Sequence, residues 1–566
     1  MCHSGLRTAV VVAVLLCASV WGRAAQPALV PTGVEEHRCG FDELQERKTG
    51  TRVSRVSHVA HADADERSMV TASTAWQPIR IAVFTDDIAD SSHYCTAAGQ
   101  LRPNFTGGTV TCRSADVLTH TKKQTLLELL IPSAVELHGE RLNVQREGGN
   151  IVVNSAIRRD SVCGQFSIPA SHTTTGVANA DFMLYMSAGP TSGGTIACAT
   201  TCQNFANGRP SVGVSNVSPM YITADPQTVR VVAHEILHAL GFSFSTFSAQ
   251  SIVGTAAAVR GKPSIPVVTS PTVVAQAQAQ YGCGTQAIME LEDMGGSGTA
   301  YSHWKRRSAK DELMAGISGV GYYTALSIAA MEDLGYYKGN YAMAEPMVYG
   351  QNAGCGLLTD KCVANSVSQF PAMFCESQKK TLLCTSDRMG VGYCAVSKYG
   401  SSLPAQFQYF SDSGVGGGDA LMDYCPFVQV YRNTNCTVDG GYLVGGVYGV
   451  MSRCFDTPKG FTLGAAPYAQ LSICVEVQCA TSTYAVRLSR SSGFTACPSG
   501  AEVALSSLSL TFSSGYITCP SYDSVCAMRL NATHYEEYMS AFANGSAPAA
   551  SIVLAVMTAM LALLVG

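Results

Sequence analysis

Runs of apolar residues, and the spacing between them, divide the chain into recognisable segments. Apolar runs occupy residues 8–20 and 552–566, whereas residues 26–75 are polar and show little apolar periodicity. From Trp76 onward, apolar runs at 79–84 and 182–186 predict strands. A leucine-rich stretch at 125–144 predicts a helix interrupted near Pro132. These patterns predict a domain of mixed α and β structure, in the α+β class.

The most regular helix is predicted over residues 226–240. Asp225 and Pro226 supply an N-cap and a first-turn proline, and Gly241 can end the helix in the left-handed conformation. The helix carries the sequence HEILH at 234–238, which places His234 and His238 on one face. Two such imidazoles can hold one Zn²⁺, with Glu235 beside a metal-bound water. The pattern predicts a zinc hydrolase, although two core histidines on an ordinary helix would give the same five letters.

A catalytic zinc commonly has three protein ligands, so one more must be found. The short metzincin pattern HExxHxxGxxH requires a histidine where this chain has Phe244. Downstream of the motif, only His303 and His534 remain, and His303 is favoured because His534 lies just before the C-terminal tail. The residues still open at this point are the upstream histidines and two carboxylates: His93, His120, His138, His172, Glu290 and Glu292.

Residues beyond the motif change in character twice. Small and polar residues dominate 242–302, which predicts a surface insertion, and a helix is predicted from about 321 to a stop at Gly335. From Cys355 onward the chain holds 13 of its 22 cysteines together with glycine-rich turns. This composition predicts a disulfide-rich second domain of short strands and irregular structure.

Composition indicates the number of domains and the compartment in which the protein folds. The chain has 566 residues, 47% apolar and 14% charged, with a formal charge of −4. This length predicts two or three domains, and the charge gives no support to a nucleic-acid partner. The 22 cysteines indicate folding in a secretory compartment. The same route is indicated by Asn-x-Ser/Thr sequons at Asn104, Asn216, Asn435, Asn531 and Asn544.

Both ends of the chain fit this route. Residues 1–25 are predicted to be a signal peptide, and 541–566 a glycolipid (GPI) attachment signal. The attachment candidates are Asn544, Gly545 and Ser546. A tail-anchored helix is the alternative for the last segment, but the apolar run is short and has no charged residue after it.

Several separated motifs resemble the leishmanolysin family, the zinc surface proteases of trypanosomatid parasites. The resembling stretches keep their order from about residue 76 to beyond 362, and they are residues 199–203, 230–242, 302–303, 311–314, 321–326 and 350–355. The family consists of metzincins in which a long insertion separates the helix-ending glycine from the third histidine. The resemblance therefore implies His303 as the third ligand and Met314 as the methionine of the Met-turn. Gly316 departs from the family pattern, which has proline there, and this affects the stiffness of the turn.

The resemblance also bears on two cysteines. Cys39 lies in an His-Arg-Cys element similar to one in the family, which implies a cysteine switch, a thiolate that occupies the metal's water position until the pro-segment is removed. A spare thiol in a disordered arm is the alternative. When the three cysteines before residue 40 are set aside, 19 remain, so one is unpaired within the chain. Cys198 is predicted to be that one, because resembling sequences lack a cysteine there.

The resulting hypothesis is a zinc-dependent, GPI-anchored cell-surface endopeptidase made as a latent precursor and acting on extracellular or host proteins and peptides. A metzincin-like catalytic domain carries Glu235 as the general base. Two alternatives are a catalytically silent adhesin of the same fold and a gluzincin-type protease with a glutamate as third ligand. The predicted segments are 1–25 signal peptide, 26–75 pro-segment, 76–241 catalytic subdomain, 242–302 insertion, 303–345 third ligand and Met-turn, 346–540 cysteine-rich domain, and 541–566 GPI signal.

Overall fold

The computed structural model describes residues 41, 44, 55–56 and 74–528, apart from residues 193, 297–298, 318, 377–380, 439, 442 and 490–491. The predicted signal peptide and GPI signal, Cys39, Asn531 and Asn544–Ser546 therefore lie outside the described residues. Among the described residues, none of the helices combines the length and apolar character needed to span a bilayer.

The N-terminal part is built on a five-stranded mixed sheet with the order β1-β8-β9-β7-β3. Strands β3, β7 and β9 are parallel, β8 runs antiparallel to β9, and β1 pairs in parallel with β8. The strands are β1 (Arg55–Val56), β3 (Ile81–Phe84), β7 (Phe182–Ser187), β8 (Ala197–Phe205) and β9 (Pro210–Val217). The two strands predicted at 79–84 and 182–186 are thus confirmed.

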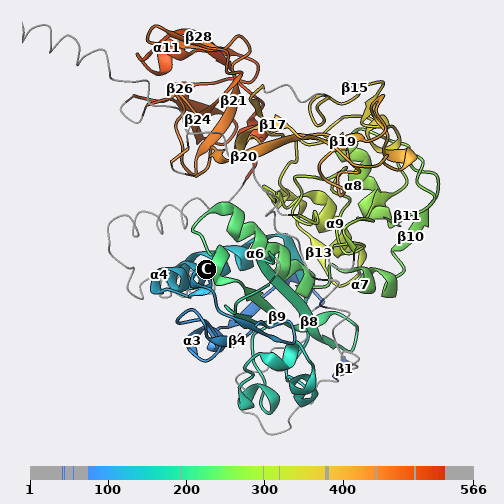
Figure 1. The fold of residues 1–566 in the computed structure, drawn as a ribbon. Helices are drawn as coiled ribbons and strands as arrows, with labels where there is room; N and C mark the ends of the chain where they lie inside the picture. Colours follow the sequence, from blue (N-terminus) through green and yellow to red (C-terminus); the bar gives the residue numbers. More distant parts are fainter. Residues whose placement is uncertain are drawn as a thin grey trace, which may run out of the picture.

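Helices α5 (Ile131–Arg141) and α6 (Pro226–Ala239) pack on each other, and α6 lies against β8 and β9 (Figure 1). The predicted helix over 125–144 continues through Pro132 instead of breaking there. A π-helical stretch, Thr125–Leu130, precedes α5 and shifts the hydrogen-bond register, so that the proline falls in the first turn of α5. The leucines of this stretch share the main hydrophobic core with α6.

The remaining elements of the N-terminal part are short. Their strands form two small sheets, β13-β6-β2 and β4-β5, the first of which includes β13 (Lys338–Gly339) from later in the chain. The elements are β2 (Trp76–Pro78), α3 (Asp86–Ala89), β4 (Leu101–Pro103), β5 (Thr109–Thr111), α4 (His120–Gln124) and β6 (Leu142–Gln145).

The insertion at 242–302 is an integral part of the fold, so the expectation of a surface segment is wrong. It forms α7 (Phe244–Ala249), β10 (Val253–Ala256), β11 (Ile265–Val268), α8 (Pro271–Tyr281) and β12 (Met289–Glu290). Strand β11 is buried, and α8 packs against α9 (Ala325–Asp333). The alanines and valines of this segment allow the close packing. Because such small residues give only a weak apolar pattern, the sequence did not identify these positions as part of the core.

The C-terminal region contains an eight-stranded antiparallel sheet with its own hydrophobic core, coloured orange in Figure 1. Residues between Leu357 and Phe427 instead contribute to the main core of the catalytic part. The sheet comprises β21 (Ser452–Asp456), β22 (Phe461–Leu463), β23 (Ala466–Tyr468), β24 (Ser472–Cys479), β25 (Tyr484–Arg487), β26 (Thr495–Ala496), β27 (Glu502–Ala504) and β28 (Phe512–Thr518).

Short elements connect the two cores. They are β13 (Lys338–Gly339), α10 (Gly356–Thr359), β14 (Val363–Ala364), β15 (Val367–Ser368), β16 (Leu383–Cys384), β17 (Gly390–Cys394), β18 (Val396–Lys398), β19 (Val415–Gly417) and β20 (Val428–Asn435). Helices α11 (Leu505–Leu508) and α12 (Tyr522–Cys526) lie in the C-terminal sheet region.

Nine disulfides join the described cysteines, six of them within the region from Cys362 onward. One further bridge, Cys283–Cys355, ties the insertion to the chain after α9. Cys198 is the one free cysteine among the described residues, as predicted, and it is buried.

Candidate metal centre

Three histidine side chains converge at the end of α6. The Nε2 atom of His238 lies 3.1 Å from the Nε2 atoms of both His234 and His303, and the last two are 3.3 Å apart. His234 is 5% exposed, and the other two are fully buried. The structure thus brings together the two helical histidines and His303, which is 65 positions beyond His238 in the chain.

The outer nitrogen of each imidazole is bound to a backbone carbonyl. Nδ1 of His234 donates to Leu313 O at 2.6 Å, that of His238 to Phe242 O at 2.7 Å, and that of His303 to Thr299 O at 2.8 Å. A proton held on each Nδ1 leaves a lone pair on each Nε2, which is the tautomer required of a metal ligand. The three lone pairs point at one another, an arrangement that repels unless a cation lies between them.

These donors fit a zinc ion. Nitrogen ligands at about 2.0–2.1 Å from a tetrahedral Zn²⁺ stand roughly 3.3–3.4 Å from one another, close to the separations observed here. Three protein ligands leave a fourth position for water or substrate. The geometry therefore suits a catalytic metal rather than a closed structural one.

The turn after α6 is made by Gly241, whose φ of 115° is accessible to glycine and strained for other residues. The Phe242 amide donates a hydrogen bond to Leu237 O. The Phe242 carbonyl oxygen accepts the hydrogen bond from Nδ1 of His238. The predicted helix end at Gly241 is thus confirmed, and the reversed backbone also orients a metal ligand.

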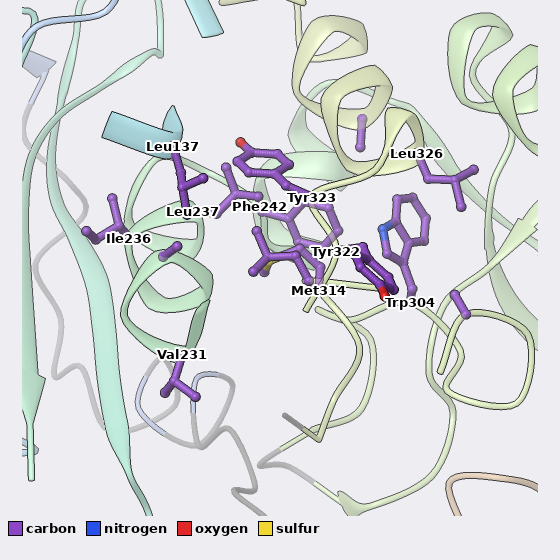
Figure 2. Close-up of a cluster of buried hydrophobic side chains, with 14 of the residues drawn as sticks. Leu137, Val231, Ile236, Leu237, Phe242, Trp304, Met314, Tyr322, Tyr323 and Leu326 are labelled. Carbon is purple, nitrogen blue, oxygen red and sulfur yellow. The ribbon is translucent and has the colours of Figure 1, made fainter. Parts of the chain in front are cut away.

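Met314 is fully buried in a hydrophobic cluster that includes Phe242, Trp304 and Leu326 (Figure 2). The Met314 carbonyl oxygen accepts a hydrogen bond from the amide of Trp304, which is the residue directly after His303. Two residues on, a Cβ at Gly316 would stand 2.2 Å from Cγ2 of Thr299, whose carbonyl holds His303. Glycine at 316 thus leaves room for Thr299 beneath the third histidine.

The rival carboxylate ligands are engaged elsewhere. Glu290 is bound by both terminal nitrogens of the Arg260 guanidinium, at 2.5 and 2.6 Å. Glu292 accepts from the Lys305 ammonium group at 2.7 Å. Both pairs are buried, and neither glutamate belongs to the group of potential metal ligands.

The upstream histidines also lie outside this group. His93 pairs with Asp87, His172 bonds the Tyr185 hydroxyl, and His120 is exposed at the start of α4. His138 is buried, and its Nε2 contacts Ala233 O at 2.9 Å. Its burial lowers the pKa of His138 to about 3, so this ring is neutral and structural.

Glu235 follows His234 on α6 and is fully buried. It is near enough to Cys198 of β8 that its charge, together with the larger effect of burial, raises the pKa of that thiol.

Sequence reasoning missed Glu312. This buried carboxyl group accepts hydrogen bonds from the Met314 amide and from the hydroxyls of Thr324 and Ser327, and so joins the turn at Met314 to the start of α9. Burial raises the pKa of Glu312 to about 7, although these hydrogen bonds act in the opposite direction. Nothing in the spacing of residues 311–314 separates this side chain from an ordinary surface glutamate.

Residues of the predicted pro-segment also reach the centre. Phe41 stacks on the imidazole of His238 with ring centroids 4.2 Å apart and an interplanar angle of 10°. Leu44 packs with Val162 and Cys198, and β1 adds to the edge of β8. Cys39 itself lies outside the described residues.

The sequons differ in accessibility. Asn216 is fully buried, and its side chain bonds both the amide and the carbonyl of Gly189, so its burial argues against a glycan there. Asn104 is 9% exposed and caps a turn through the amides of Thr106 and Gly108. Asn435 is half-buried.

Comparison with known proteins agrees with the site. A family model described as leishmanolysin, a peptidase family, matches residues 23–532. The leishmanolysin of Leishmania major is 41% identical over 515 residues, covering 85% of each chain. A leishmanolysin homolog of Crithidia fasciculata is 41% identical over 508 residues, covering 87% of this chain and 77% of its own. A leishmanolysin-like peptidase of Drosophila melanogaster is 27% identical over 433 residues, covering 57% of this chain and 63% of its own. This chain belongs to the leishmanolysin family of zinc metalloendopeptidases.

Proposed function

We propose that the protein is a metzincin-type zinc endopeptidase that cleaves extracellular or host proteins. The observation that carries the proposal is the convergence of three Nε2 atoms within 3.3 Å, each with its Nδ1 atom bound to a carbonyl. His234, His238 and His303 would hold the ion. When bound, zinc lowers the pKa of its water towards about 7 and polarises the scissile carbonyl.

The chain's own part in the chemistry falls to Glu235. Its carboxylate takes a proton from the attacking water and passes it to the departing amine, acting first as base and then as acid. Burial of Glu235 excludes bulk water, which would otherwise compete for that proton. The carbonyl-bound Nδ1 atoms keep the three imidazoles fixed while the proton moves.

The two alternatives fit the structure less well. A silent adhesin has no need of three buried, oriented imidazoles beside a buried glutamate. A gluzincin requires a glutamate ligand, but Glu290 and Glu292 are paired with Arg260 and Lys305.

The test is casein cleavage by the purified, matured protein before and after treatment with 1,10-phenanthroline, followed by addition of Zn²⁺. We expect chelation to abolish cleavage and zinc to restore it. Glu235→Gln is the matched variant, which should keep its zinc and lose about 10²- to 10⁴-fold in rate. Cleavage by this variant at the wild-type rate would contradict the role assigned to Glu235.

We also propose that the protein is made as a latent precursor in which Cys39 supplies a thiolate to the metal. Phe41, two residues after Cys39, stacks on His238, and this contact supports placing Cys39 at the metal. An organomercurial that reacts with Cys39 should activate the secreted precursor. A precursor that stays inactive after the reaction would count against the switch.

Attachment to the outer face of the plasma membrane through the predicted GPI signal completes the proposal. Phosphatidylinositol-specific phospholipase C should release the protein from intact cells. Retention at the surface after the treatment would favour the tail-anchored alternative.

A further inference from the structure

A small apolar site lies under Leu44 of the predicted pro-segment, three residues after the Phe41 ring that stacks on His238. Leu44 is 3% exposed and packs with Val162 and Cys198 in a cluster separate from the larger cores. The leucine side chain therefore fills a place that the globular part of the chain leaves for it.

The two residues that contact Leu44 belong to different elements. Cys198 belongs to β8, whose neighbours in the sheet are β9 and the short β1. Val162 precedes the 3₁₀ turn Cys163–Gln165, and the disulfide Cys163–Cys202 ties this turn to β8. The bridge keeps both walls in place when the leucine is absent.

The site is close to the reacting groups. Phe41, three residues before Leu44, stacks on the ligand His238, and the charge of Glu235 acts on the Cys198 thiol. A peptide that lies over the metal therefore passes within a few residues of this site. Since the walls are apolar and one wall is a small side chain, the site suits a medium-sized apolar group.

We propose that Val162 and Cys198 line a substrate subsite that accepts an apolar, leucine-sized side chain, and that Leu44 occupies it in the precursor. This inference rests on the proposed protease function, because it assigns a specificity role at that active site. Cys198 sets the depth of the subsite, and the loss of Leu44 uncovers its thiol.

The first experiment needs no catalysis. Full-length precursor carrying Glu235→Gln is treated with N-ethylmaleimide, and labelling of Cys198 is followed by peptide mass spectrometry. We expect Leu44→Gly to raise the labelling rate at least tenfold and Leu44→Met, which refills the site, to leave it unchanged. Leu505→Ala, in the separate C-terminal core, is the control for general destabilisation and should not raise the rate. Equal labelling rates of Cys198 in the precursor that keeps Leu44 and in the Leu44→Gly variant would overturn the proposal.

The second experiment measures specificity in the matured enzyme. Peptide libraries are compared for wild type, Cys198→Ala and Cys198→Trp. We expect Cys198→Trp to lower kcat/KM at least tenfold for peptides with leucine at one particular position, and to spare those with glycine at that position. Cys198→Ala keeps the site open and should retain the preference for leucine. An equal loss for all peptides, or no loss, would overturn the subsite.

The two experiments separate the possible failures. If the wild-type enzyme cleaves nothing, the proposed function fails while the labelling result still shows whether Leu44 covers Cys198. If cleavage is normal and the leucine preference is unaffected by Cys198→Trp, only the subsite is rejected.

Discussion

Glu312 shows how a single buried carboxyl group supports the candidate site from outside the group of three histidines. It accepts hydrogen bonds from the Met314 amide and from the Thr324 and Ser327 hydroxyls. Between them, the Leu313 carbonyl accepts from His234. The carboxylate thus links a ligand's hydrogen-bond partner to the start of α9.

The raised pKa of Glu312 predicts a pH-dependent stability. Its pKa rises from an ordinary 4.5 to about 7, so the folded protein keeps this proton to higher pH than the unfolded chain does. The contribution is complete below the unfolded pKa and is lost as pH rises towards 7. Relative to Glu312→Gln, wild type should lose about 3 kcal/mol of unfolding free energy between pH 4.5 and 7. Urea unfolding at several pH values measures this, and a difference that is constant with pH would disprove the assignment.

Single residues also mark the limit of sequence reasoning. His234, Glu235 and His238 are evident because four-residue spacing on a helix is a local property. His303 became a firm choice only through family resemblance, since it lies 65 positions beyond His238 in the chain. Glu312 was missed because its partners come together only in the folded chain.

At the scale of elements, α6 is the helix that most of the site depends on. The Asp225 side chain accepts hydrogen bonds from the amide and hydroxyl of Thr228 and so caps the helix that carries His234, Glu235 and His238. Cap, first-turn proline and final glycine are local signals, and they predicted this helix to within a residue or so. The helix around Pro132 was less well predicted, because a π-helical turn is set by packing and not by a local sequence pattern.

Removal of the cap should weaken α6. We expect Asp225→Ala to lower the unfolding free energy by about 1 kcal/mol, because the Thr228 amide at the helix start loses its acceptor and the Thr228 hydroxyl loses one of its partners. Asp225→Asn keeps an acceptor and should lose much less. Thermal unfolding of both variants measures the effect, and equal losses would show that the cap is not responsible.

On the scale of the whole molecule, a buried charge network joins three distant segments. Asp423 binds the ammonium groups of Lys262 at 2.6 Å and Lys305 at 2.8 Å, and the guanidinium of Arg260 at 3.2 Å. Lys305 lies two residues after His303, so the cysteine-rich region supports the third ligand. The sequence pattern could not reveal this, because ion pairs between distant segments leave no periodicity.

The network predicts that Asp423 matters far beyond its own region. Asp423→Ala leaves three buried cations short of an anion and should destabilise the protein by about 3–5 kcal/mol, with weaker zinc retention. The matched control is Asp412→Ala, which breaks the exposed Lys398–Asp412 pair and should have no measurable effect. Thermal unfolding and zinc analysis together measure this. Similar stability in the two variants would contradict a structural role for the network.

We propose that His303 completes a zinc site with the two histidines of α6. The most direct measurement is the zinc content of purified wild type, His303→Ala and the surface control His120→Ala, with casein cleavage assayed in parallel. We expect one zinc per chain and full activity in wild type and His120→Ala, and far less than one zinc with no activity in His303→Ala. A His303→Ala protein that keeps one zinc per chain and cleaves casein would contradict it.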